Sequence, residues 1–170
     1  MPVFAGEIRK AEVDYSGGAY YLDFDAVINS RFEVVHSIVT DYEHLHELSS
    51  AVLESAVLDS SDPGAKRLRF FAQVCLLVFC FNKYLVVDIV EVSRGVFNAT
   101  VVPQLCDFKA GHGTWHFTAV GKVRTRVRYT GVQRPAFWIP PVIGPYLIKR
   151  KLVREAIETI QQVEVLTGDA

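Results

Sequence analysis

Hydrophobic residues recur at three- and four-residue steps near the end of the chain, from Pro140 to Thr167. The positions of this stripe are Ile143, Leu147, Val153, Ile157, Ile160 and Val163. Such spacing predicts an amphipathic α-helix of about 25 residues, nearly 40 Å long. Pro140 and Pro141 suit its entrance and Gly168 its end, while Pro145 either marks a second start or kinks the first turn. The apolar stripe must be buried, so the rest of the chain is expected to form the surface that it packs on.

The preceding chain alternates apolar and polar residues with a period of two, which predicts β-strands. Residues 7–15 and 19–29 flank Ser16-Gly17-Gly18 and are predicted to form a hairpin. Turn residues bound the other predicted strands, which are 51–59, 66–74, 82–92, 96–102, 111–120 and 123–132. This meander follows one early helix and precedes one late helix, an order that favours an α+β fold with a mainly antiparallel sheet.

Residues 30–41 have the pattern of the early helix. Ser30 followed by Glu33 fits a capping box, in which each side chain bonds to the other residue's backbone N–H. Apolar residues then follow at helical spacing, namely Phe32, Val35, Ile38, Val39 and Tyr42. The helix is therefore expected to begin at Ser30 and to end near Asp41.

The composition narrows the classes of protein. A chain of 170 residues predicts one domain, 1–170. Apolar residues make up 50% of it and aromatic residues 12%, so the interior is expected to be larger or emptier than average. A net charge of −1 provides no general attraction to nucleic acid, and no nucleic-acid partner is expected. No run approaches the ~18 apolar residues of a membrane-spanning helix, and the first residues are too short for a secretory signal.

The three cysteines, Cys75, Cys80 and Cys106, cannot all pair, and none of them forms a C-x-x-C motif. We interpret them as buried free thiols in a reducing compartment. This interpretation favours a cytoplasmic location.

The histidines and acids do not form a recognisable catalytic group. His112 and His116 bracket Thr114 on one strand face, which leaves open a proton relay or, with His44 or His46, a metal site. However, no third ligand has a characteristic spacing, and the pair lies opposite the apolar parity. We therefore expect no metal, no cofactor and no catalytic residue. Asp88 and Glu91 either enter the apolar interior as polar anchors or, as the pattern favours, lie on the other face.

Three segments carry a family resemblance: FEVVHSIVTDYEHLHELSSAVLESAVL from Phe32, GTWHF from Gly113 and PAFWIPPVIG from Pro135. With them, nearly the whole chain resembles the START-related helix-grip proteins (SRPBCC superfamily), in particular the polyketide cyclase and coenzyme-Q-binding branch. The resemblance implies a curved antiparallel β-sheet wrapped around a long C-terminal α-helix, with a short helix after the second strand. It also implies a hydrophobic cavity between sheet and helix for a lipid, quinone, sterol or polyketide-like molecule.

Strand parity and the helix stripe indicate which side chains would line that cavity. The predicted ligand-binding residues are Phe70, Ala72, Phe97, Ala99, Trp115, Phe117, Val127 and Tyr129 on the strands, and Tyr146, Val153 and Ile157 on the helix. The alternative is that these residues fill a solid core.

Three functions fit the sequence. The first is binding or carriage of a hydrophobic small molecule, the second is a cyclase, aromatase or dehydratase acting on a polyketide-like substrate, and the third is a protein–protein interaction module. Because no residue constellation supports catalysis, we favour the binder. The pattern does not indicate the ligand or the oligomeric state.

The proline-bounded segment 135–141 is predicted to form the mouth of the cavity and to touch a membrane surface transiently. Its apolar residues are Phe137, Trp138 and Ile139, and Lys149 and Lys151 follow as candidate contacts for anionic headgroups. The alternative is that Phe137 and Trp138 fold inward as a lid on the core.

Overall fold

The computed structural model describes residues 5–168, so residues 1–4 and 169–170 of the predicted domain lie outside the described part. The strands are β1 (Glu7–Ser16), β2 (Ala19–Ile28), β3 (Val52–Leu58), β4 (Lys66–Leu76), β5 (Phe79–Ser93), β6 (Val96–Val101), β7 (Phe108–Val120) and β8 (Arg124–Pro135). The helices are α1 (Phe32–Val39) and α2 (Gly144–Gly168), with short 3₁₀ helices η1 (Tyr42–Leu48) and η2 (Pro103–Leu105).

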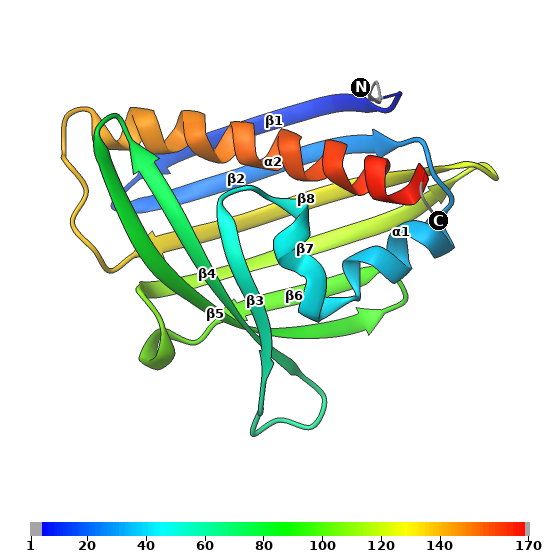
Figure 1. The fold of residues 1–170 in the computed structure, drawn as a ribbon, viewed down its shortest axis with the longest axis horizontal. Helices are drawn as coiled ribbons and strands as arrows, with labels where there is room; N and C mark the ends of the chain where they lie inside the picture. Colours follow the sequence, from blue (N-terminus) through cyan, green and yellow to red (C-terminus); the bar gives the residue numbers. More distant parts are fainter. Residues whose placement is uncertain (1–4, 169–170) are drawn as a thin grey trace.

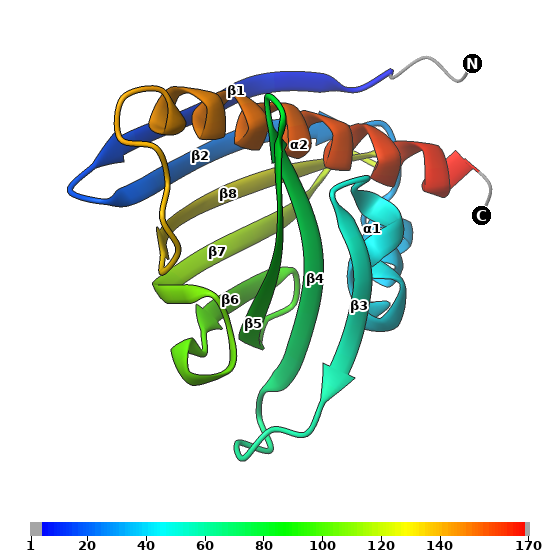
Figure 2. The same ribbon diagram turned by 60° about the vertical axis from the view of Figure 1, so that its left-hand side comes forward.

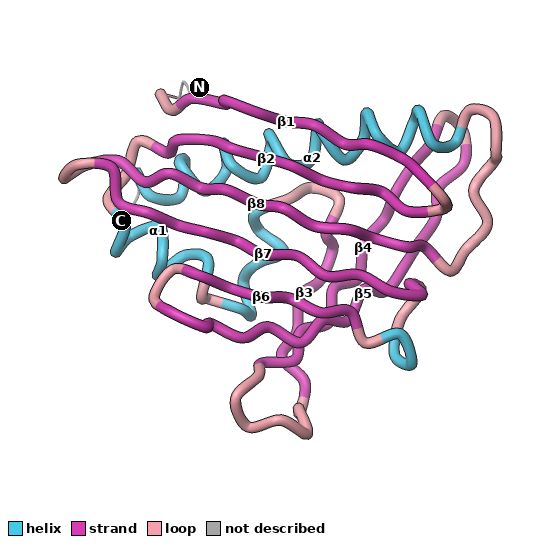
Figure 3. Tube along the Cα trace, turned by 180° about the vertical axis from the view of Figure 1, so that it is seen from behind, coloured by secondary structure: helices cyan, strands magenta, loops and turns pink. Residues whose placement is uncertain are grey.

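The described strands form one antiparallel sheet in the order β1-β2-β8-β7-β6-β5-β4-β3. The sheet curves around α2, which runs along β1 and β2 (Figures 1 and 2). The short helices α1 and η1 lie near the C-terminal half of α2. Seen from behind, the strands cover α2 on one side (Figure 3). The predicted α+β helix-grip fold, with its short helix after the second strand, is confirmed.

The long hairpin β4–β5 extends further than predicted. Residues 75–81, which the alternation left between two strands, continue the pairing up to Leu76 opposite Phe79. Side chains on both faces of this tip are apolar, so the period of two that marks a strand is lost there.

α2 begins at Gly144, not at Pro140. Residues 140–143 form a turn that the Gly144 N–H closes on the Pro140 carbonyl at 2.9 Å. Pro145 sets this boundary. In a helix that began at Pro140, residue 145 would have to donate its N–H to the Pro141 carbonyl, and proline has no N–H, whereas a proline is tolerated in the first turn of a helix that begins at Gly144. The prediction for Pro140 and Pro141 is therefore wrong, whereas the alternative that Pro145 marks a start is confirmed.

The predicted capping box of α1 is also wrong. Arg31, in an extended conformation, is the N-cap residue and makes no side-chain capping bond. The Ser30 carbonyl instead accepts a hydrogen bond from the hydroxyl of the fully buried Thr125 at 2.8 Å. This contact fixes the chain between β2 and α1, and the helix starts only after it.

Apolar side chains on the inner face of the sheet form three clusters. Under the C-terminal half of α2, Phe97, Phe117 and Val127 pack with Ile160 and Val163. The second cluster, nearer the start of α2, joins Val13, Tyr20, Phe24 and Tyr129 to Leu152 and Val153. The third places Leu68, Val87 and Val101 against Tyr42 and Leu45 of η1. Arginines occupy the opposite face, where Arg126 pairs with Asp25 and Arg67 with Asp88.

The interpretation of the cysteines as three buried free thiols is wrong for two of them. Cys75 and Cys80, both exposed, face each other across β4 and β5 and form a disulfide. Cys106 is free and half-buried. Pairing was overlooked because the register of this hairpin, which brings the two residues opposite each other, is not visible in the spacing. The argument for a reducing compartment therefore no longer applies to Cys75 and Cys80.

Neither helix of the described residues combines the length and apolar character needed to span a bilayer.

Candidate functional site: a groove between β1 and α2

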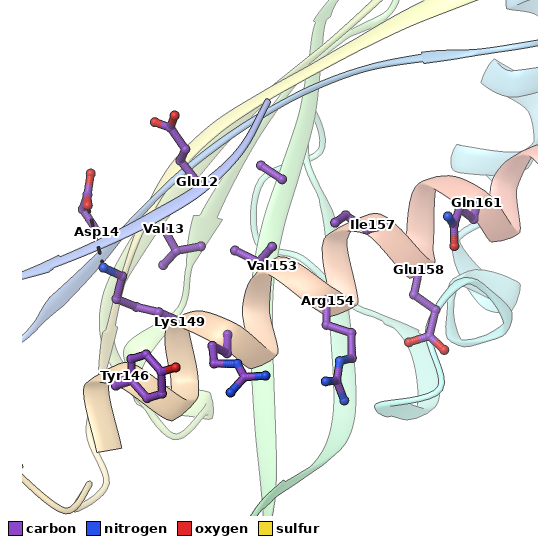
Figure 4. Close-up of a pocket in the computed structure, with 12 residues that line it drawn as sticks. Glu12, Val13, Asp14, Tyr146, Lys149, Val153, Arg154, Ile157, Glu158 and Gln161 are labelled. Carbon is purple, nitrogen blue, oxygen red and sulfur yellow. Dashed lines mark ion pairs between the residues drawn. The ribbon is translucent and has the colours of Figure 1, made fainter. Parts of the chain in front are cut away.

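An open groove of about 830 Å³ lies between the edge strand β1 and the helix α2. Ala11 and Val13 contribute to its wall from β1, and Val153 and Ile157 from α2. Figure 4 shows Val13 pointing toward the helix while Val153 and Ile157 point toward the strand. Facing apolar side chains with space between them suit an apolar ligand.

The rim of the groove carries balanced charge. Glu12, Asp14 and Glu158 oppose Lys149, Arg150 and Arg154. At one end the Lys149 Nζ lies 3.9 Å from the Asp14 carboxylate, and in Figure 4 Arg154 and Glu158 extend away from the strand. Three acids against three bases leave the rim without a net charge that would select an anionic or cationic ligand.

The helix residues of the predicted ligand set line this groove. Val153 and Ile157 lie in its wall, and Tyr146, 61% exposed, stands at its end beneath the guanidinium of Arg150. The sequence did not point to Ala11 and Val13, because they alternate with charged residues on an edge strand of the first hairpin. Their apolar parity was the only signal available.

The strand residues of the predicted set lie on the inner face of the sheet, away from the groove wall. Phe97, Phe117, Val127 and Tyr129 are buried in the core clusters. The half-buried members are Phe70, Ala72, Ala99 and Trp115. Their parity was therefore predicted correctly, and contact between these eight residues and a ligand stays a prediction.

Three polar side chains interrupt the apolar inner face near the start of α2. Tyr20 pairs in register with Gln133, and Tyr129 lies four residues before Gln133 on the same face of β8, with Gly131 between them. The Tyr20 hydroxyl and the Gln133 Oε1 are buried without a hydrogen-bond partner in the protein. Burial raises the pKa of Tyr20 to about 12. It also raises the pKa of Tyr129, an effect that the side-chain amide of Gln133 opposes. At neutral pH both hydroxyls therefore act as hydrogen-bond donors, not as bases.

A half-buried ion pair lies on the face of α2 that is turned toward η1 and β3. Lys151 Nζ is 2.6 Å from one Glu155 oxygen, and the Ser49 hydroxyl donates to the other at 2.6 Å. Glu155 thus links α2, through the Ser49 hydroxyl, to the segment between η1 and β3. Lys151 is thus engaged within the fold.

A second pocket, of about 350 Å³, lies where α1 meets the end of β5. There His36 Nε2 lies 2.7 Å from Glu91 Oε1, which also accepts the Gly95 N–H at 2.9 Å. Burial tends to raise the pKa of Glu91, but these two partners lower it overall. Glu91 therefore anchors the β5–β6 turn to α1, while Asp88 binds Arg67 on the outer face. No group of three His, Cys, Asp or Glu side chains within residues 5–168 is placed to hold a metal ion.

The residues predicted to touch a membrane divide between surface and interior. Trp138 is 72% exposed. The Phe137 ring packs edge-on against Phe108 with the Lys83 ammonium 4.8 Å above it, and Ile139 joins the second core cluster. The inward alternative therefore describes the packing of Phe137 but not that of Trp138.

The family model for polyketide cyclases/dehydrases and lipid transport proteins matches residues 22–163. The chain belongs to this family. The match confirms the resemblance to START-related helix-grip proteins, and the family description names both enzymes and carriers. A comparison with curated protein sequences found no match.

Solved structures support the fold. An aromatase/cyclase, Zhui, from a Streptomyces species is 12% identical, with a TM-score of 0.67 over 88% of this chain and 94% of that one. A START superfamily protein from Mycobacterium smegmatis is 15% identical, with the same TM-score over 88% and 97% of the two chains. A STAR-related lipid transfer protein fragment from Xanthomonas axonopodis is 12% identical, with a TM-score of 0.63 over 92% and 98%. At such identities the likeness concerns the fold alone.

Proposed function

We propose that this protein binds a hydrophobic small molecule in the groove between β1 and α2. The observation that carries the proposal is the pair of facing apolar walls, Ala11 and Val13 on the strand and Val153 and Ile157 on the helix, around about 830 Å³ of open space. This volume suits a ligand of the size of a fatty acid, a sterol or a short-chain quinone. The balanced rim favours a ligand that is neutral or that keeps its charged group in water.

Filling the groove tests the proposal. Ala11, half-buried in the wall, is replaced by Trp, and binding of a fluorescent fatty acid is measured with a short-chain quinone as competitor. We expect the added ring to occupy the ligand's space and to weaken binding by about tenfold or more. Ala110→Trp, an exposed position of β7, is the matched control and should bind as the wild type does.

A second variant separates the groove from the inner face of the sheet at its other end. Ala72→Trp fills the inner face on β4, next to the edge strand β3, where strand parity predicts ligand contact. If Ala72→Trp blocks binding and Ala11→Trp does not, the ligand lies against β4 and the groove proposal is wrong. If neither folded variant changes binding, both sites are rejected. Native mass spectrometry of the gently purified protein would then identify any molecule that it carries.

The buried polar groups favour one alternative function, a cyclase acting on a polyketide-like substrate. Two tyrosine hydroxyls and an amide gathered on an apolar face could hold a carbonyl oxygen and polarise it. Tyr20→Phe removes one donor while keeping the ring. A loss of cyclised product from a poly-β-carbonyl substrate in this variant, with fatty-acid binding unchanged, would favour the enzyme. An equal rate of cyclisation with and without the wild-type protein would reject it.

A further inference from the structure

Large apolar side chains are exposed at two segments near the start of α2. At the tip of hairpin β4–β5, Leu77 is 72%, Val78 86% and Phe79 63% exposed. In the loop between β8 and α2, Trp138 is 72%, Val142 89% and Ile143 50% exposed. Figures 1 and 2 show both segments beside the N-terminal half of α2. We call these six residues the apolar tip.

The hairpin part of the apolar tip has residues that do not suit its backbone conformation. A two-residue hairpin turn favours Asn and Gly, because it requires positive φ, yet Leu77 occupies it with a φ of 58°. The Cys75–Cys80 disulfide joins the two strands just below the turn. A cross-linked turn that carries Leu and Val at the cost of backbone strain indicates a use for the exposed side chains.

Charge is arranged in the same way around both segments. Residues 70–82 contain no charged side chain and are bounded by Arg69 and Lys83, and residues 135–148 contain none and are bounded by Arg134 and Lys149. Arg150 follows directly and is exposed. Part of this positive charge is offset, since the Asp14 carboxylate lies 3.9 Å from the Lys149 Nζ. The attraction to an anionic surface is therefore modest, and apolar contact has to provide most of the affinity.

We propose that the apolar tip docks on the surface of an anionic lipid bilayer. Leu77, Val78 and Trp138 enter the interface between headgroups and acyl chains, and the flanking cations face the phosphates. A bilayer suits this surface better than a folded partner, because two narrow projecting loops offer little of the flat area that a protein interface buries. The proposal goes beyond ligand binding, because none of the six residues lines the groove.

The test uses the whole protein and vesicles of phosphatidylcholine, with and without phosphatidylserine. We expect the wild type to float with the anionic vesicles and to be released by salt. Leu77→Gly with Val78→Asn places a glycine at the position of positive φ, so the hairpin should fold while its apolar side chains are lost. This variant, and Trp138→Ser separately, should each lower the affinity for anionic vesicles by about tenfold or more.

Val123→Asn is the matched control. Val123 is 61% exposed and lies in the turn between β7 and β8, at the opposite end of β8 from the loop that carries Trp138. It should float as the wild type does. Wild-type protein that does not bind anionic vesicles, or a Leu77→Gly, Val78→Asn variant that floats unchanged, overturns the proposal. A vesicle-free dimer that this variant abolishes would also overturn it, by assigning the tip to self-association. Fatty-acid binding without vesicles should be unaffected in the tip variants, so the result does not depend on the groove.

Discussion

The ring of Tyr129 occupies the space that a side chain at Gly113 would need. A Cβ placed on Gly113 would come within 2.5 Å of the Tyr129 hydroxyl and ring, and one on Gly131, its register partner, within 2.3 Å of the same hydroxyl. The two glycines thus form a hollow in the inner face of the sheet, and Tyr129 lies in it beside Trp115. This packing explains the small residue at the head of the GTWHF segment.

Gly113→Ala is accordingly expected to destabilise the protein. The added methyl group must displace a buried ring, so the free energy of unfolding should fall by about 1–3 kcal/mol in denaturant melts. Gly168→Ala is the control, because nothing lies within 4 Å of a Cβ there and the change should be small. Equal stability of the two variants would show that Tyr129 moves aside without cost.

Trp115 joins two of the three core clusters. Its ring centroid lies 4.2 Å from that of Tyr129 and 6.2 Å from that of Phe117. Trp115→Ala should lower the unfolding free energy of the ligand-free protein by about 3 kcal/mol. Trp138→Ala, at an exposed site, should change it by only about 0.5 kcal/mol. A similarly small effect at Trp115 would mean that this ring serves a ligand and not the core.

The Arg67–Asp88 pair should make stability depend on acid. Arg67 donates two hydrogen bonds of 2.8 Å to Asp88 and holds the pKa of that carboxyl below its ordinary value of 3.8. The stabilisation is present above the pKa of the unfolded chain and is lost as pH falls through the lower, folded value. Asp88→Asn should therefore cost about 1 kcal/mol at pH 7 and little near pH 2, as measured by melts at both values. A constant difference across this range would exclude the pair as its cause.

The disulfide of hairpin β4–β5 is expected to contribute to stability. Cys75→Ser with Cys80→Ser should lower the unfolding free energy by about 2 kcal/mol, since the cross-link closes only a short loop in the unfolded chain. Thiol labelling of the native protein checks the pairing directly. Cys106 alone should react after unfolding without reductant, and labelling of all three cysteines under those conditions would contradict the pairing.

Period-two and helical patterns predicted most of the architecture, because the inner face of each strand is apolar and its outer face polar. The alternation of Val127 and Tyr129 with Arg126 and Arg128, for example, assigned β8 its two faces correctly. The pattern failed at residues 75–81, where both faces are apolar and most side chains, apart from Leu76, are at least partly exposed. It also placed the start of α2 too early, because Ile143 continues the stripe although the helix has not yet begun.

The candidate site was less accessible to such reasoning. Val153 and Ile157 were recognised from the helix stripe, but their partners Ala11 and Val13 belong to a strand more than a hundred positions earlier. Only the packing of α2 along the edge of the sheet brings these residues together. Tyr20 and Gln133 were missed for the same reason, since their pairing depends on β2 lying beside β8.

The neighbouring positions of β2 and β8 affect how the chain can fold. Asp25 and Arg126, which join the two strands, are 101 residues apart in sequence, whereas the hairpins β1–β2 and β4–β5 close locally. Such distant pairing must overcome a large loss of chain entropy before it gains contacts, so folding in milliseconds to seconds is expected for this topology. During synthesis the β2 edge of the first hairpin stays unpaired until β8 has left the ribosome, and over that interval it is open to association with other nascent chains.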